Sequence, residues 1–223
     1  MFEDPNILEF GVDEVGRGPL FGRVYTAAVV LPKDDSFEHH LMKDSKKFHS
    51  EKRIKEASNY IKMNALAYSI NYESETTIDE INILQATQKS MHASIQAVKK
   101  QLLELNIIDS TTPIHLLIDG NYFNPIPILN KKTNRMDFIP YTTVEQGDGK
   151  FTSIAAASIL AKVARDEYIA ELCSAHPELS ERYGIDSNKG YAAKKHTDGI
   201  KEHGITQWHR KSFKPCSSFV TKE

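Results

Sequence analysis

Apolar residues follow two different periods along this chain, and the two periods predict two kinds of element. Short, dense apolar runs predict β-strands at about 7–14, 22–32, 65–73, 114–120 and, more weakly, 139–145. Apolar residues at helical spacing predict two long helices, at about 78–105 and 151–173, and two shorter ones, after Ser50 and over 190–204. Strands come first and helices alternate with the later strands, so the pattern predicts a mixed α/β fold.

The ends of these elements and their connections carry signals of their own. Pro19 and the glycines around it predict a hairpin-like connection between the first two strands. Thr77 and Glu80 form a capping-box pattern at the start of the first long helix. Gly199 weakens the helical pattern over 190–204. We expect one main domain at 1–174, with a small basic and helical region at 175–223 packed on it.

Composition excludes several classes of protein. Hydrophobic residues make up 40% of the 223 residues and charged residues 26%, which is typical of a globular protein. No apolar run approaches the roughly 18 residues that a membrane span requires, and the N-terminus lacks the pattern of a signal peptide. Cys173 and Cys216 lie far apart and form no metal-binding pair. We therefore expect a cytoplasmic protein without membrane contact.

Charge is unevenly distributed, although the net charge is only −2. Between residues 189 and 214 the chain carries seven lysines and arginines against two acids, with three histidines among them. A segment of this kind is either a solvated helical surface or a contact surface for a polyanion such as nucleic acid. The charge pattern alone leaves both interpretations open.

Four acids occupy positions that suit a metal site. Asp13 and Asp119 each end a predicted strand with glycine close behind, Glu14 follows Asp13, and Asp148 lies between two glycines before a long helix. Ligand sites in α/β proteins favour the carboxyl ends of strands. Carboxylates that meet at one point repel each other unless a cation lies among them, and Mg²⁺ or Mn²⁺ accepts oxygen ligands of this kind. For each acid taken alone, an ordinary turn is the alternative.

Asp13 and Glu14 raise a geometric difficulty. Neighbouring side chains on a regular strand point to opposite faces of the sheet. Both acids can therefore serve one metal site only where the strand bends or ends. Gly16 lies two residues beyond Glu14, and the sequence predicts a bend between Glu14 and Gly16.

Taken together, the motifs of this chain resemble those of type 2 ribonuclease H, the ribonuclease HII family. The matching segments lie between about residues 10 and 213, in the order DEVGRGPLFG, KDSKKF at 43–48, LLIDGN at 116–121, QGDGKFTSIAAASILAKVARD at 146–166, and NKGYAAKKH with HGITQWHRKSF at 188–213. The resemblance implies a ribonuclease H-like fold, in which helices flank a mixed sheet and a helical C-terminal region follows. Residues 1–174 would then form the catalytic domain, and 175–223 would bind substrate.

The resemblance also implies an activity. Members of this family are endonucleases that hydrolyse the RNA strand of RNA–DNA hybrids. They also cut 5′ of single ribonucleotides embedded in duplex DNA, leaving 3′-hydroxyl and 5′-phosphate ends, and so remove ribonucleotides and primers from DNA. The resemblance implies catalysis with two divalent ions, Mg²⁺ or Mn²⁺, held by acids that fall on Asp13, Glu14, Asp119 and Asp148. Asp166, inside the second long helix, is expected to form an ion pair on the helix surface instead.

Carried over by position, the resemblance assigns the substrate contacts as well. The turn Gly16–Arg17–Gly18 would read the ribose 2′-hydroxyl, which distinguishes RNA from DNA, and Arg17 would lie near a phosphate. Tyr191 would stack on the sugar of the adjoining deoxynucleotide. Without the resemblance, this tyrosine would be interpreted as a core or helix-start aromatic. Phosphate contacts are expected from five further residues: Ser45, Lys46, Lys150, Ser153 and Lys189.

Some features depart from the family pattern or leave alternatives open. Phe21 and Arg23 stand where small residues or proline are usual, and Ala192 follows Tyr191 where glycine is common. One rival is a type 3-like ribonuclease H, poor at single ribonucleotides. The start of the first motif at residue 11 leaves no room for the extra N-terminal domain of that class. Another rival is a non-catalytic nucleic-acid-binding module. A monomer is expected, and a sliding clamp as partner is left open.

Overall fold

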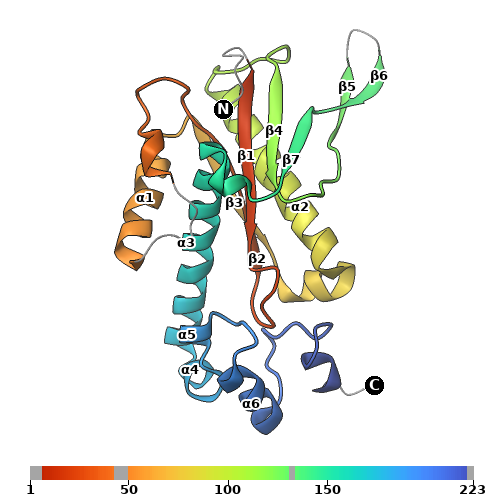
Figure 1. Ribbon diagram of the computed structural model, residues 1–223. Helices are drawn as coiled ribbons and strands as arrows, with labels where there is room; N and C mark the ends of the chain where they lie inside the picture. Colours follow the sequence, from red (N-terminus) through yellow and green to blue (C-terminus); the bar gives the residue numbers. More distant parts are fainter. Residues whose placement is uncertain (1–6, 43–49, 131–133, 220–223) are drawn as a thin grey trace.

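A five-stranded sheet forms the centre of the computed structural model, which describes residues 7–42, 50–130 and 134–219 (Figure 1). The strands lie in the order β3–β2–β1–β4–β7. Pairing is antiparallel between β1 and β2 and between β2 and β3, and parallel between β1 and β4 and between β4 and β7. The carboxyl ends of β1, β4 and β7 therefore meet at one end of the sheet. The bounds are β1 Leu8–Val15, β2 Val24–Val30, β3 Ala67–Glu73, β4 Ile114–Asp119 and β7 Tyr141–Val144.

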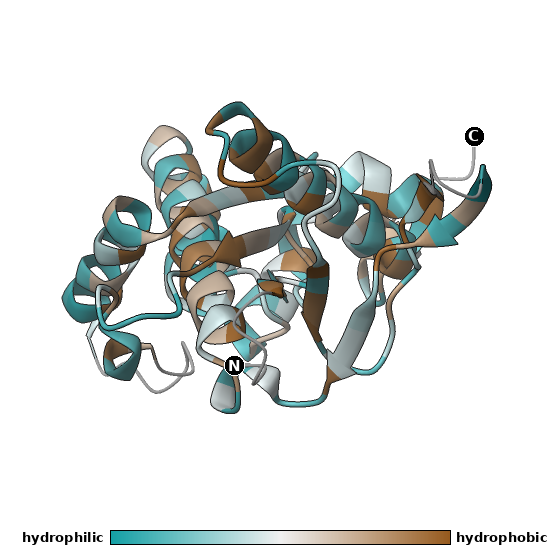
Figure 2. Ribbon diagram, turned by 90° about the horizontal axis from the view of Figure 1, so that it is seen from above, coloured by the Kyte–Doolittle hydropathy of each residue, from teal (hydrophilic) through white to brown (hydrophobic). Residues whose placement is uncertain are grey.

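Helices cover both faces of this sheet. α1 (Glu51–Asn64) and α3 (Thr152–Ala175) pack on one face, where their apolar residues form a core with β2. α2 (Glu75–Glu104) packs on the other face against β3, β2 and β1. Figure 2 shows the apolar strands enclosed between the two helical layers. The whole of β2 is buried, because helices cover both faces of the sheet at this strand.

Three short helices follow α3: α4 (Glu178–Tyr183), α5 (Ile185–Asn188) and α6 (Lys194–His203). They lie at the end of the molecule where the β1–β2 connection projects (Figure 1). A separate apolar cluster joins this region to Leu20 and Phe21 of that connection. The α/β class and the helical C-terminal region are confirmed, whereas the boundary near residue 174 stays a prediction.

Some predicted details are wrong. Ser74, not Thr77, caps α2, because its side chain accepts a hydrogen bond from the backbone N–H of Thr77 at 3.2 Å. Asn82 interrupts this helix with a φ of 65° and accepts a hydrogen bond from the N–H of Gln85. The hairpin of β5 (Pro127–Asn130) and β6 (Arg135–Phe138) was not predicted. Gly199 is required in α6, since an added Cβ would lie 2.2 Å from the carbonyl oxygen of Arg182.

The approach of α3 to the sheet is set by one glycine. A Cβ on Gly11 of β1 would lie 2.1 Å from the backbone carbon of Ser153. Only glycine allows the first turn of α3 to pack this closely on the central strand. None of the helices in the described part of the chain combines the length and apolar character needed to cross a membrane.

Candidate active site

Three acids meet where β1 and β4 end. Asp119 is the last residue of β4 and lies next in line after Ile118, which pairs with Val12 of β1. Asp13 and Glu14 follow Val12 directly. One oxygen atom from each of Asp13, Glu14 and Asp119 lies within 4.8 Å of the other two. The sequence-based expectation that these acids converge is therefore met for three of the four.

The strand reaches this cluster without bending at Glu14. β1 stays paired with β2 through Val15, and the chain changes direction at Gly16, whose φ is 93°. The bend that was predicted between Glu14 and Gly16 thus lies at Gly16. Because the pairing of β4 with β1 stops at Val12, no residue of β4 pairs with Glu14. The side chain of Glu14 can therefore approach Asp119 at this edge of β1.

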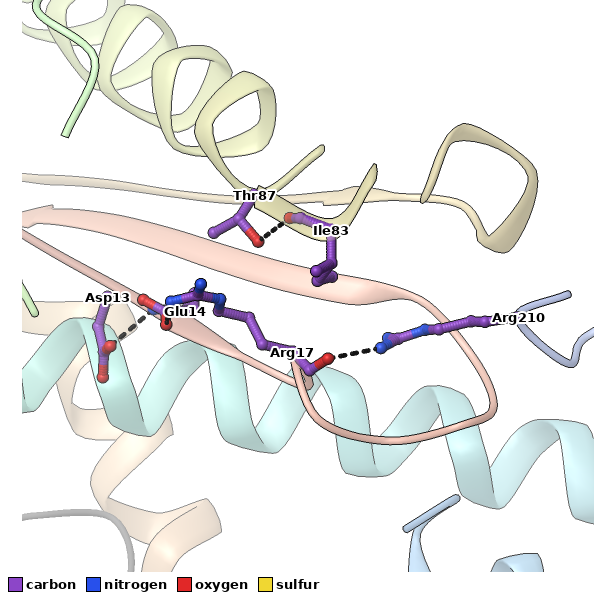
Figure 3. Close-up of polar contacts among 6 residues, drawn as sticks. All are labelled: Asp13, Glu14, Arg17, Ile83, Thr87 and Arg210. Atoms are coloured by element: carbon purple, nitrogen blue, oxygen red, sulfur yellow. Dashed lines mark hydrogen bonds and ion pairs between the residues drawn. The ribbon is translucent and has the colours of Figure 1, made fainter. Parts of the chain in front are cut away.

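Burial and repulsion between the acids raise the pKa values of Asp13 and Glu14. Asp13 is only 5% exposed, and burial, with Glu14 and Asp119 nearby, holds its pKa well above the usual range. Burial also raises the pKa of Glu14 to about 7, although the neighbouring Arg17 opposes the shift. Asp13 Oδ1 accepts a hydrogen bond from the backbone N–H of Glu14 at 2.7 Å (Figure 3). A cation among these oxygens would relieve the repulsion.

Asp148 approaches the same cleft from a separate loop. It lies in a single 3₁₀ turn (Gly147–Gly149) that precedes α3. The N–H of Gly147 donates to Asp119 Oδ1 at 2.7 Å, which ties this turn to the end of β4. A Cβ on Gly147 would lie 2.6 Å from Ile154 Cδ1 and 3.1 Å from Asp119 Oδ1, so a larger residue there would displace neighbouring side chains. Asp148 lines the cleft but does not belong to the tight group of three acids.

The donor set suits a hard divalent cation. Every member of the group of three offers a carboxylate oxygen, and neither histidine nor cysteine belongs to it. Mg²⁺ and Mn²⁺ prefer oxygen ligands, whereas zinc sites in proteins favour sulfur and nitrogen. The raised pKa of Glu14 fits the same interpretation, since a cation would favour the ionised carboxylates. The residues present thus fit a divalent metal site.

The acids line one wall of a cleft of about 510 Å³. The turn Gly16–Arg17–Gly18 lines the same cleft, and so does Tyr191, which is half exposed. A Cβ on Gly18 would lie 3.6 Å from Cε1 of Tyr191, so the tyrosine ring lies close to the turn. The remaining walls come from α3 and from the segment around α5, through Ser158, Lys162, Arg165 and Ser187–Lys189.

Other predicted contacts lie elsewhere. Ser153 is 5% exposed, its hydroxyl has no hydrogen-bond partner among the described residues, and it lies beneath Gly11 rather than in the cleft. The expected phosphate contact is therefore not available in this arrangement. Lys150 is exposed, and its Nζ donates to the carbonyl of Glu145 at 2.7 Å. Ser45 and Lys46 lie outside the described residues. Asp166 forms the expected ion pair, with Lys162.

Two buried arginines that sequence reasoning missed donate to the backbone of the β1–β2 connection, and one of them, Arg210, holds the turn. Arg210 has no exposed surface and donates to the carbonyls of residues 16, 17, 19 and 22 at 2.6–2.9 Å. Arg165 is 1% exposed and donates to the carbonyls of Phe21, Arg23 and Lys189. Figure 3 shows the side chain of Arg17 directed toward Glu14 and its carbonyl toward Arg210. Only the position of Arg210 within HGITQWHRKSF could have pointed to it.

Comparison with known proteins identifies the family. A family model described as ribonuclease HII matches residues 10–216. The chain belongs to the ribonuclease HII family. The ribonuclease HII of Bacteroides thetaiotaomicron is 44% identical over 93% of this chain and 90% of the relative. That of Cytophaga hutchinsonii is 41% identical over 95% of this chain and 92% of the relative.

Solved structures confirm the fold. The ribonuclease HII in a PCNA complex from Archaeoglobus fulgidus superposes with a TM-score of 0.64 at 23% identity, covering 93% of this chain and 96% of that one. A Bst-RNase HIII in complex with Mn²⁺ gives the same TM-score at 20% identity, covering 96% of this chain and 70% of that one. As a ribonuclease HII, the chain is an endonucleolytic hydrolase of the ribonuclease H class that acts on nucleic acid and uses divalent metal.

From the raised pKa of Glu14 we expect the affinity of this ribonuclease HII for metal to depend on pH. Ligand carboxylates must be ionised, so protons compete with the metal below the pKa of about 7. Between about pH 6 and pH 8 we expect the affinity for Mn²⁺ to rise and the number of protons released on binding to fall. Titration calorimetry in two buffers of different ionisation enthalpy measures both quantities. Glu14→Gln should show a weaker pH dependence, and an affinity that is constant over this range contradicts the assignment.

Proposed function

We propose that this chain hydrolyses the RNA strand of RNA–DNA hybrids and cuts 5′ of single ribonucleotides in duplex DNA. The products would carry 3′-hydroxyl and 5′-phosphate ends, and the activity would serve ribonucleotide excision and primer removal. One observation carries the proposal: the acids and the Gly16–Arg17–Gly18 turn line the same cleft, and only Val15 separates Glu14 from the turn. A ribonucleotide that lies against the turn would thus present its phosphodiester to the acids.

The metal-binding residues in this proposal are Asp13, Glu14 and Asp119, together with Asp148, which lines the same cleft. Two divalent ions, Mg²⁺ or Mn²⁺, would supply an activated water and neutralise the leaving oxygen. The protein holds the carboxylates at a fixed separation and burial before substrate arrives. Burial of Asp13 strengthens the attraction between its charge and a bound cation, because little water remains to screen it.

The turn is built for close approach of a backbone to a ligand. A Cβ on Gly16 would lie 2.3 Å from Nε of Arg165, and its φ of 93° favours glycine. The side chain of Arg17 is 48% exposed and its Nη1 lies 3.3 Å from Glu14 Oε1, within reach of a phosphate at the cleft. Lys189 lines the cleft. Ser45, Lys46 and Lys150 remain proposed contacts with the phosphate backbone.

Tyr191→Ala should reduce cleavage at a lone ribonucleotide more than cleavage of a continuous hybrid. The ring lies beside Gly18 in the cleft, where it can stack on the sugar next to the ribonucleotide. A stacking contact is worth about 1–3 kcal/mol, so we expect roughly a tenfold or larger fall in the ratio of the two rates. Single-turnover rates on the two duplexes measure this ratio. Tyr122→Ala, which removes a tyrosine of similar exposure outside the cleft, serves as control. Equal losses on both substrates would remove the sensing role.

The same assay separates the rival functions. A type 3-like enzyme would cut the hybrid and leave the single-ribonucleotide duplex nearly intact. A non-catalytic binding module would bind both duplexes after chelation of metal and cut neither with any divalent ion. Mapping the cut on a duplex with one internal ribonucleotide tests the proposed 5′ position directly.

A further inference from the structure

Two buried histidines link the C-terminal segment to Tyr191. His196, in α6, and His209 are 0% and 1% exposed. Their Nε2 atoms lie 3.1 Å apart. His196 Nδ1 lies 2.8 Å from the carbonyl oxygen of Tyr191, and His209 Nδ1 lies 2.9 Å from the backbone nitrogen of Thr206. The two rings thus form a continuous chain of hydrogen bonds between two backbone groups.

The backbone groups at the two ends fix the protons within this chain. The N–H of Thr206 can only donate, so His209 Nδ1 must accept and the proton of this ring lies on Nε2. That Nε2–H donates to His196 Nε2, which leaves the proton of the second ring on Nδ1. His196 Nδ1–H then donates to the carbonyl of Tyr191. Every polar atom of both rings is satisfied when both are neutral, each in one defined tautomer.

The surroundings favour this neutral state. Phe21 and Tyr183 pack edge-on against the pair, with ring centroids 5.1 Å from that of His209 in both cases. Burial lowers the pKa of His196, and burial and the neighbouring His196 lower the pKa of His209 to about 3. The nearest charged neighbour along the chain, Arg210, is itself a buried cation. Phe21, which departs from the usual family pattern, thus forms one wall of the histidine site.

The position of Tyr191 depends on hydrogen bonds of this kind, because the residue belongs to no helix or strand. Its residue lies between α5 and α6, and half of its surface is exposed. Its carbonyl accepts from His196 and from the N–H of Ala193 at 2.8 Å, and its own N–H donates to Asn188. The bond from His196 is the one that connects Tyr191 to His209. The backbone of His209 in turn forms an isolated β-bridge with Phe21 in the β1–β2 connection.

We propose that His196 and His209 are positioning residues, which hold Tyr191 beside the Gly16–Arg17–Gly18 turn and so set the preference for a lone ribonucleotide over a continuous hybrid. This inference rests on the proposed function of Tyr191. His196 acts on the backbone of Tyr191, and His209 acts by orienting His196. Neither histidine lines the cleft itself.

Two substitutions of His196 separate its two bonds. In His196→Asn the amide nitrogen takes the place of Nδ1 and keeps the bond to Tyr191, while the bond to His209 is lost. In His196→Gln the amide oxygen takes the place of Nε2 and keeps the bond to His209, while the bond to Tyr191 is lost. Each variant loses one bond, so both should be destabilised to a similar extent. We expect His196→Gln to lower the ratio of single-ribonucleotide to hybrid cleavage roughly tenfold and His196→Asn to change it less than about threefold.

His203→Gln, in the last turn of the same helix, is the control, because the partly exposed His203 side chain lies against Glu202 and not against Tyr191. Similar ratios for both His196 variants, with a changed ratio for Tyr191→Ala, would overturn the positioning role and leave the proposed function intact. An unchanged ratio for Tyr191→Ala would instead overturn the sensing role of the tyrosine.

Nitrogen NMR of the free wild-type protein at neutral pH gives a readout independent of cleavage. We expect His196 as the Nδ1–H tautomer and His209 as the Nε2–H tautomer, and a shifted carbonyl carbon signal of Tyr191 in His196→Gln but not in His196→Asn. The opposite tautomers, or a protonated ring in either histidine, would overturn the proposal even if both variants cut poorly.

Discussion

Asp119→Asn is expected to lower the rate of cleavage roughly 10³-fold or more, because the ribonuclease HII site loses one of its three closely spaced carboxylates. Asparagine keeps the shape of the side chain. Its amide oxygen can still accept the hydrogen bond from the N–H of Gly147, which ties the Asp148 turn to β4. The substitution therefore removes the charge and leaves the arrangement of the cleft in place.

The measurement compares cleavage with Mg²⁺ and duplex binding after chelation, for the wild type and the variant. Binding should persist in Asp119→Asn, since the turn, Tyr191 and Lys189 are unchanged. Glu104→Gln, an exposed acid at the end of α2, controls for the loss of a negative charge. Asp119→Ala, which also removes the bond to Gly147, should in addition be less stable. A cleavage rate for Asp119→Asn near that of the wild type would refute the role of this acid.

Arg210→Met is expected to lower the free energy of unfolding by about 4 kcal/mol or more, since unpaired buried acceptors each cost about 1–3 kcal/mol. Arg210 donates to four carbonyls of the β1–β2 connection, the shortest bond being 2.6 Å, to Gly16. Burial and the nearby Arg165 lower the pKa of Arg210 to about 9, so the guanidinium is still a cation at neutral pH. Arg210→Lys should be nearly as unstable as Arg210→Met, because one ammonium cannot replace the planar, multiple donors of a guanidinium.

Chemical denaturation measures this loss. Lys211→Met is a matched control, because the neighbouring lysine side chain is exposed. At a temperature where Arg210→Met remains folded, cleavage of both substrates should fall, since the Gly16–Arg17–Gly18 turn loses its donors. A loss of unfolding free energy below about 1 kcal/mol, the size of one ordinary hydrogen bond, would show that the four bonds do not hold the turn.

Local signals in the sequence were sufficient to predict the strands of the main sheet and the positions of the acids at their ends. The apolar runs predicted all five strands of the main sheet, and glycine after Asp13 and Asp119 marked the strand ends. Both features depend on residues close together along the chain. Parallel pairing of β1 with β4 then brings Asp13 and Asp119 together without further information.

Other features depend on contacts that no local pattern encodes. Ser153 lies on the side of α3 that packs on Gly11, and the helical pattern alone did not give the rotation of that helix. Ser74 and Thr77 are both favourable residue types for a helix N-cap. Ser74 takes this position because β3 ends at Glu73, directly before it. The contact of Arg210 with Gly16 joins residues 194 positions apart, and the pairing of His196 with His209 is visible only in three dimensions.

The long separation between Gly16 and Arg210 has a consequence for biosynthesis. A ribosome makes the chain from its N-terminus, so Asp13, Glu14, Asp119 and Asp148 are all present before Arg210 is added. A nascent chain at that stage has the acids but lacks the donors that order the turn beside them. On the proposed function, the nuclease would acquire its ability to select ribonucleotides only after Arg210 has been made, although all four acids are present well before.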